Sequence, residues 1–88
     1  MSSIISVPNE QVVFTDFDGN EGILVDLNTK KYYQLNETAM LVWKALEKKK
    51  SLAEIVAEFT TVYDVTSERA TKSVERLLES MKLYKLVQ

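Results

Sequence analysis

The sequence predicts an α+β domain in which a three-stranded antiparallel β-meander is followed by three helices, an arrangement of winged-helix character. Short β-branched and aromatic runs alternate with turn residues as far as Leu35, and helix-capping patterns with apolar residues at helical spacing follow from Asn36. The length of 88 residues is enough for one domain and not for two. We therefore expect a flexible N-terminal tail at residues 1–10 and a single folded domain at residues 11–88.

The three strands are expected at residues 11–15, 21–27 and 31–35, with turns at 16–20 and 28–30. If the second turn is a three-residue loop, a common type, the opposed pairs are Leu27–Lys31, Val25–Tyr33 and Ile23–Leu35. Alternation along the strands then sets the two faces of the sheet. The core face carries Ile23, Val25, Leu27, Tyr33 and Leu35, and the other face carries Leu24, Asp26, Tyr32 and Gln34.

The first helix is expected at residues 37–48, because Asn36 is a good N-cap and Glu37 sits in the first turn, near the positive end of the helix dipole. Its apolar residues recur at helical spacing and include Trp43, which we expect to be a core anchor rather than a ligand contact. Lysines at residues 48–50 end the helix, with cations at its negative end.

The second and third helices are predicted from their caps. Ser51 and Glu54 have the spacing of a capping box, which starts the second helix, and the β-branched residues at 60–61 predict its end. Thr66 or Ser67 caps the third helix, which should run to about residue 83. After it, Leu86 or Val87 is expected to fold back onto the body of the domain.

The composition argues against catalysis and against metal or cofactor binding. The chain contains no cysteine and no histidine, so thiolate sites, disulfides and the commonest general base are excluded. Residues 16–20 faintly resemble a calcium loop but lack its spacing and its terminal glutamate. No apolar run is long enough to span a membrane, and the start has no signal-peptide pattern. We expect a cytoplasmic, non-catalytic protein with no cofactor, no metal and no membrane partner.

The net charge of −2 is unevenly distributed. Every charged residue in the first quarter of the chain is acidic, whereas residues 30–50 contain six lysines against two glutamates. This basic segment is either a solvated face or a patch that attracts an acidic peptide or enzyme surface.

The stretch at residues 23–39, ILVDLNTKKYYQLNETA, resembles the PqqD family. Members typically carry a leucine-rich strand that ends in Asp-Leu, then a tight turn, an aromatic pair, and Leu-Asn at the start of a helix. Later family features also have counterparts here, at Trp43, Ser51-Leu52, Tyr63-Asp64-Val65 and Leu86-Val87. The resemblance covers residues 11–87, and Lys30 stands where the family often has glycine.

This resemblance implies a stand-alone recognition element for ribosomally synthesised and modified peptides, of the lasso-peptide or PQQ-pathway type. The precursor's leader segment would add as a strand along the third strand, in a groove against the third helix, and would be delivered to a modifying enzyme or leader peptidase. In the helix, Arg69 and Lys72 are candidates to pair with leader carboxylates. The full predicted binding set is Lys31, Tyr32, Tyr33, Gln34, Leu35, Arg69, Lys72, Val74, Leu77, Leu78 and Met81.

Two alternatives remain open from the sequence. The second and third helices form a pair like a helix-turn-helix, which would suit a winged-helix DNA-binding domain. The third helix is nearly balanced in charge and the sequence pI is about 5.1, so we expect no nucleic-acid partner. A generic adaptor would share the fold but bind some other protein segment.

Overall fold

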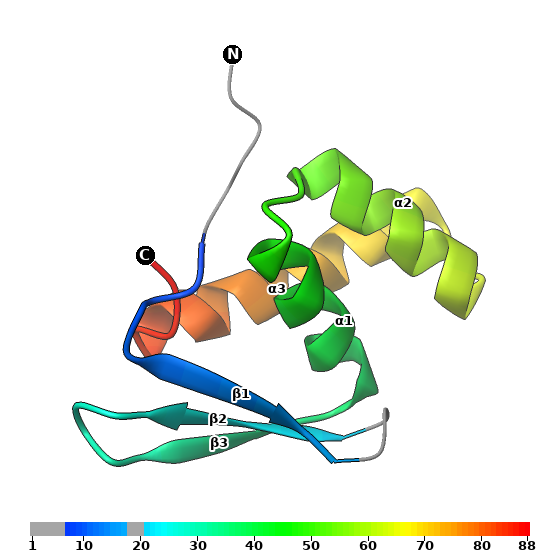
Figure 1. The fold of residues 1–88 in the computed structure, drawn as a ribbon. Helices are drawn as coiled ribbons and strands as arrows, with labels where there is room; N and C mark the ends of the chain where they lie inside the picture. The colour runs from blue at the N-terminus through cyan, green and yellow to red at the C-terminus, as the bar shows by residue number, and fades with distance from the viewer. Residues whose placement is uncertain (1–6, 18–20) are drawn as a thin grey trace.

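A computed structural model describes residues 7–17 and 21–88, and it has the predicted order of elements. Three antiparallel strands form one sheet in the order β1-β2-β3, and the helices lie on one side of it (Figure 1). The α+β prediction is therefore confirmed, although the likeness to a winged helix is loose. The elements are β1 (Val12–Asp16), β2 (Gly22–Asp26), β3 (Tyr32–Leu35), α1 (Glu37–Glu47), α2 (Leu52–Tyr63) and α3 (Ser67–Leu83).

The hairpin between β2 and β3 corrects the predicted register by one residue. Val25 lies opposite Tyr32 and Leu24 lies opposite Tyr33, whereas the sequence had suggested Val25 opposite Tyr33. The predicted three-residue loop is wrong, because the Asp26 N–H donates to the Lys31 carbonyl at 2.8 Å and four residues lie between them.

The side chain of Asp26 explains the longer loop. Its Oδ1 accepts hydrogen bonds from the backbone N–H groups of Asn28 at 2.9 Å and Thr29 at 3.3 Å. Lys30 then closes the turn with a φ of 66°, the left-handed region, and its N–H donates to the Asp26 carbonyl at 2.8 Å. An aspartate that bonds to the backbone two residues on is a strong turn former, so it fixes where β2 ends.

The shifted register exchanges the two faces of β2. Leu24 is fully buried and Asp26 is only 4% exposed, whereas both had been predicted on the outer face. Ile23 and Val25 are partly exposed instead, and Leu27 is 49% exposed. On β3 the face assignment is consistent with burial, because Leu35 is buried and Tyr32 is 72% exposed.

The predicted helix caps are confirmed. The Asn36 side chain accepts from the Ala39 N–H, and the Thr66 side chain accepts from the Arg69 N–H. Ser51 and Glu54 form both bonds of a capping box. The predicted end of α2 is wrong by two residues: the helix passes the β-branched pair and ends at Tyr63, before a left-handed Asp64 with a φ of 51°.

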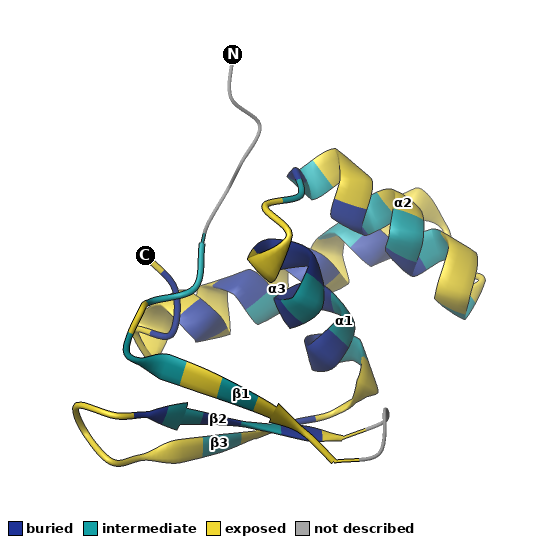
Figure 2. Cartoon of the chain, in the orientation of Figure 1, coloured by how far each residue is buried: buried dark blue, intermediate teal, exposed yellow. Residues whose placement is uncertain are grey.

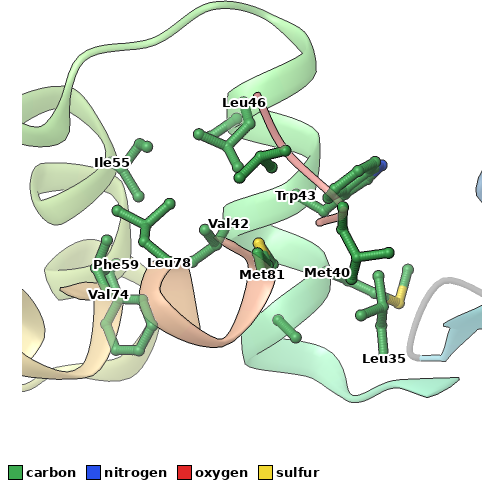
Figure 3. Packing of buried hydrophobic residues seen from close by; sticks show 14 of the residues in the cluster. Leu35, Met40, Val42, Trp43, Leu46, Ile55, Phe59, Val74, Leu78 and Met81 are labelled. Atoms are coloured by element: carbon green, nitrogen blue, oxygen red, sulfur yellow. The ribbon is translucent and has the colours of Figure 1, made fainter. Parts of the chain in front are cut away.

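The core lies between the three helices and the inner face of the sheet (Figure 2). α1 is at its centre, and Trp43 is 1% exposed, as predicted. In the close view, residues of α2 and α3 pack together on one side of α1, while Leu35 and Met40 lie on the other (Figure 3). No helix within the described ranges is long and apolar enough to cross a membrane.

The two ends of the described chain pair with each other. The Asn9 N–H donates to the Leu86 carbonyl at 3.0 Å, and the Gln88 N–H donates to the Val7 carbonyl at 2.8 Å. Leu86 and Val87 are buried, as predicted. Of the predicted N-terminal tail, residues 1–6 lie outside the described residues, and so do residues 18–20 of the first predicted turn.

Candidate functional site

A groove of about 670 Å³ runs between β3 and the C-terminal half of α3, with the start of α1 at its base. It is about three times as large as a second hollow, of about 220 Å³, between α1 and α2. Its lining comes from segments far apart in the sequence, which the fold brings side by side. The lining residues are Glu21, Tyr32, Tyr33, Gln34, Leu35, Asn36, Ala39, Leu77, Ser80, Met81, Tyr84 and Leu86.

The outer edge of β3 borders this groove and has no strand partner among the described residues. In an antiparallel ladder, hydrogen-bonded pairs alternate with non-bonded pairs. The bond from the Asp26 N–H to the Lys31 carbonyl therefore sets the phase of the whole β2–β3 ladder. It follows that Tyr33 and Leu35 bond to β2, while the backbone groups of Tyr32 and Gln34 face the free edge.

The two walls of the groove meet at a pair of tyrosine rings. Tyr33 on β3 and Tyr84, just after α3, have ring centroids 5.2 Å apart and planes tilted by 37°. Leu77 is partly exposed on the α3 wall, and Tyr84 is 51% exposed. These three side chains offer apolar surface that a bound chain could cover.

The floor of the groove is made of core residues. Leu35 is 6% exposed and Met81 is 4% exposed, and both belong to the main hydrophobic cluster (Figure 3). Because they support the fold from below, their surface within the groove is small. The walls rather than the floor must therefore supply most of the contact area.

The structure brings part of the predicted binding set together in this groove. Tyr32, Tyr33, Gln34, Leu35, Leu77 and Met81 all belong to its lining. Lys31, Arg69, Lys72, Val74 and Leu78 do not.

The two apolar residues outside the lining are core residues. Val74 is fully buried and Leu78 is 7% exposed, and in Figure 3 both lie beside Phe59 of α2. The first half of α3 thus faces α2, and only its second half borders the groove.

Sequence reasoning did not identify the groove residues Ser80 and Tyr84. They follow Leu77 at i+3 and i+7, so they share its helical stripe. That stripe was a usable signal, and it was not considered in the sequence analysis. Glu21, Asn36, Ala39 and Leu86 also line the groove without having been in the predicted binding set.

The lining carries little charge. Glu21 is its only acidic residue, and it contains no lysine or arginine. Among the described residues no group of three or more Asp, Glu, Cys or His side chains could hold a metal ion. Apolar walls beside unpaired backbone groups suit the binding of an extended peptide.

Comparison with known proteins gives one family and two structural neighbours. The model of the family described as coenzyme PQQ synthesis protein D (PqqD) matches residues 21–87. TbiB1 in complex with the TbiA(beta) leader peptide superposes with a TM-score of 0.88 at 24% identity, covering 93% of this chain and 94% of that chain. Lasso peptide synthetase B1 complexed with the leader peptide superposes with a TM-score of 0.86 at 24% identity, covering 94% of this chain and 96% of that chain. No curated protein sequence matches the chain.

Proposed function

The chain belongs to the PqqD family, and from this premise we propose that it binds the leader segment of a ribosomally made precursor peptide. The observation that carries the proposal is the free edge of β3 beside an apolar groove. Both structural neighbours are complexes with a leader peptide, which supports the same role here. The chain then presents the peptide to a modifying enzyme or leader peptidase, acting in the cytoplasm without catalysis of its own.

The leader adds to the sheet as a fourth strand. The backbone N–H and C=O groups of Tyr32 and Gln34 offer up to four hydrogen bonds, each worth a net ~1 kcal/mol. Association costs about 4–15 kcal/mol in lost freedom, so backbone pairing alone gives little affinity. Apolar anchors must supply the rest, at roughly 1.5–3 kcal/mol for each buried side chain. With the cost of association at its low end, about 4 kcal/mol, three anchors near the upper end of this range bring Kd to about the micromolar range.

The pleat of the added strand decides which leader residues become anchors. Side chains alternate between faces, so leader residues level with Tyr33 and Leu35 point toward the groove. Those level with Tyr32 and Gln34 point to the outer side of the sheet. The leader is therefore read at every second position along this short segment, chiefly by the wall that Leu77 and Tyr84 form.

The three cations of the predicted set take a different part in this proposal. Lys31 is exposed at the start of β3, next to the free edge. Arg69 and Lys72 are exposed in the first half of α3. Because none of them lines the groove, their role is to attract leader carboxylates from a distance, which affects the association rate more than the affinity.

The proposal is tested by blocking the edge without breaking the sheet. Gln34→Pro removes an N–H that faces the free edge, and proline is tolerated on edge strands. We expect the variant to keep the far-ultraviolet spectrum of the wild type but to bind the purified leader peptide at least about tenfold more weakly, a loss of about 1.4 kcal/mol.

The matched control is Gln34→Ala, which removes the same side chain but keeps the N–H. It should bind the leader with nearly wild-type affinity in the same calorimetric titration. If Gln34→Pro remains folded and binds as tightly as Gln34→Ala, the leader does not pair with this edge and the proposal is wrong.

A further inference from the structure

We propose that a second hollow, between α1 and α2, docks an acidic face of the protein that receives the bound peptide. The inference rests on the function proposed above. The hollow has a volume of about 220 Å³ and lies on the helical side of the molecule. Its lining is Leu41, Lys44, Ala45, Lys48, Lys50, Glu58 and Val62.

Two helical stripes build this hollow. Leu41, Lys44, Ala45 and Lys48 follow one another at i, i+3, i+4 and i+7 and therefore share one face of α1. From α2, Glu58 and Val62 face them with a spacing of four residues. The apolar members of the lining are Leu41, Ala45 and Val62, and the charged members are Lys44, Lys48, Lys50 and Glu58.

Val62 distinguishes this hollow from an ordinary charged surface. Val62 is 56% exposed, and Leu41, which also lines the hollow, is partly exposed. Lysines near the C-terminal end of α1 are explained by the helix dipole alone. The dipole does not explain why an exposed valine lies among them. Exposed apolar surface with a polar, mainly basic rim is the arrangement expected at a protein interface.

The charges of the hollow are only partly neutralised within the chain. Lys50 pairs with Glu58 at 3.2 Å, and Lys44 pairs with Asp16 at 3.1 Å, all four side chains being between 29% and 44% exposed. No ion pair within residues 7–17 and 21–88 involves Lys48 or the neighbouring Lys49. The complementary surface therefore presents carboxylates around one apolar side chain.

The hollow and the groove can be occupied at the same time. They share no lining residue, because α1 contributes Ala39 near its start to the groove and Lys48 just after its end to the hollow. A protein held at the hollow would therefore leave the leader in place. Duplex nucleic acid is a poorer fit, since the chain has a net charge of −2 and the hollow contains exposed apolar surface.

The experiment uses the full chain loaded with leader peptide and the purified modifying enzyme or peptidase encoded beside it. Biolayer interferometry measures enzyme binding, and calorimetry measures leader binding to the same samples. The test variants are Lys48→Glu, which reverses an unpaired charge, and Val62→Gln, which removes exposed apolar surface while keeping a good helix former. The control is Lys82→Glu, the same charge change on an exposed position of α3 that lines neither hollow.

We expect each test variant to weaken enzyme binding about tenfold, with Lys48→Glu also slowing association and reducing the dependence on salt. Leader affinity should be unchanged in both. The inference is overturned if enzyme binding by the test variants equals that of Lys82→Glu, or if the enzyme does not bind the wild-type chain. It is also overturned if the variants lose leader affinity in parallel, or if they chiefly abolish binding to duplex DNA at low salt.

The leader titration separates this inference from the proposed function. A wild-type chain that fails to bind the leader refutes the proposed function, whatever the enzyme does. A chain that binds the leader but docks the enzyme independently of Lys48 and Val62 refutes only the role of the hollow.

Discussion

Replacement of Asp26 by alanine should loosen the hairpin between β2 and β3, the strand that we propose to pair with the leader peptide. Its carboxylate is almost fully buried, yet it accepts hydrogen bonds from the N–H groups of Asn28 and Thr29 in an exposed loop. Asp26→Ala removes both bonds at once. The four-residue loop then loses the interaction that distinguishes it from the shorter loop of the alternative register.

The loss of stability in Asp26→Ala can be estimated from these two hydrogen bonds. Each contributes a net ~0.5–1.5 kcal/mol, and water can solvate the two exposed N–H groups once the carboxylate is gone. We therefore expect a total loss of roughly 1–3 kcal/mol. A domain of 88 residues has a free energy of unfolding of about 4–13 kcal/mol, so the variant stays folded at room temperature. For this size, each kcal/mol lowers Tm by about 4–8 °C.

Urea denaturation followed by circular dichroism measures the loss, and a leader titration measures its consequence. In the proposed complex the leader pairs with β3, so part of the destabilisation should reappear as weaker binding, about fivefold in Kd for each kcal/mol. The control is Asp26→Asn, which keeps an oxygen acceptor at the same position and should lose clearly less. An alanine variant as stable as the wild type, or an asparagine variant as unstable as alanine, would show that the carboxylate does not hold this turn.

Three further results are expected. Leu77→Glu should abolish leader binding and keep the fold, since Leu77 is a partly exposed wall residue. The control Leu77→Met should bind the leader normally. Equal binding by the two variants in a titration would contradict the placement of the wall. Ser51→Ala should lower the free energy of unfolding by about 0.5–2 kcal/mol in urea denaturation, because it removes an N-cap, and an unchanged value would contradict that role. Hydrogen bonds from the backbone N–H of Ser51, and then from its hydroxyl, lower the pKa of Glu54 below its ordinary value. The ionised Glu54 carboxylate therefore stabilises the folded state above about pH 4.3, the pKa of an unfolded glutamate. This contribution is lost as the pH falls through the lower pKa of the folded state. The difference in stability between wild type and Glu54→Gln should therefore shrink below about pH 4.3, and a pH-independent difference would argue against this coupling.

The element order and the helix starts could be predicted from the sequence because they depend on local chemistry. Asn36, Ser51 and Thr66 each satisfy an orphan N–H three residues later, and no distant part of the chain competes for that bond. The end of α2 was predicted less well. The Thr60 and Thr61 hydroxyls both donate to the Ala57 carbonyl, so the β-branched pair is accommodated within the helix instead of ending it.

The register of β3 could not be settled by pattern because both strands of the hairpin have apolar residues on both faces. In β2, residues 22–26, leucine and two further aliphatic residues follow one another, so a shift by one residue still buries an apolar set. Asp26 instead decides the register, although its side chain was predicted to lie on the outer face of the sheet. Its two hydrogen bonds to the loop are what make burial of a carboxylate acceptable.

At the groove, helical periodicity does not distinguish residues that contact the peptide from residues that hold the core. This affects which substitutions can separate peptide binding from stability. The spacing of Val74, Leu78 and Met81 identifies the apolar stripe of α3, but it does not reveal where the sheet ends and the stripe becomes accessible. Leu35 and Met81 prove to be both lining and core, being 6% and 4% exposed. A charge placed at either position would remove core packing together with any peptide contact, so lost binding would not locate the groove. A wall residue such as Leu77, which is only partly buried against the core, separates recognition from stability better than Leu35 or Met81.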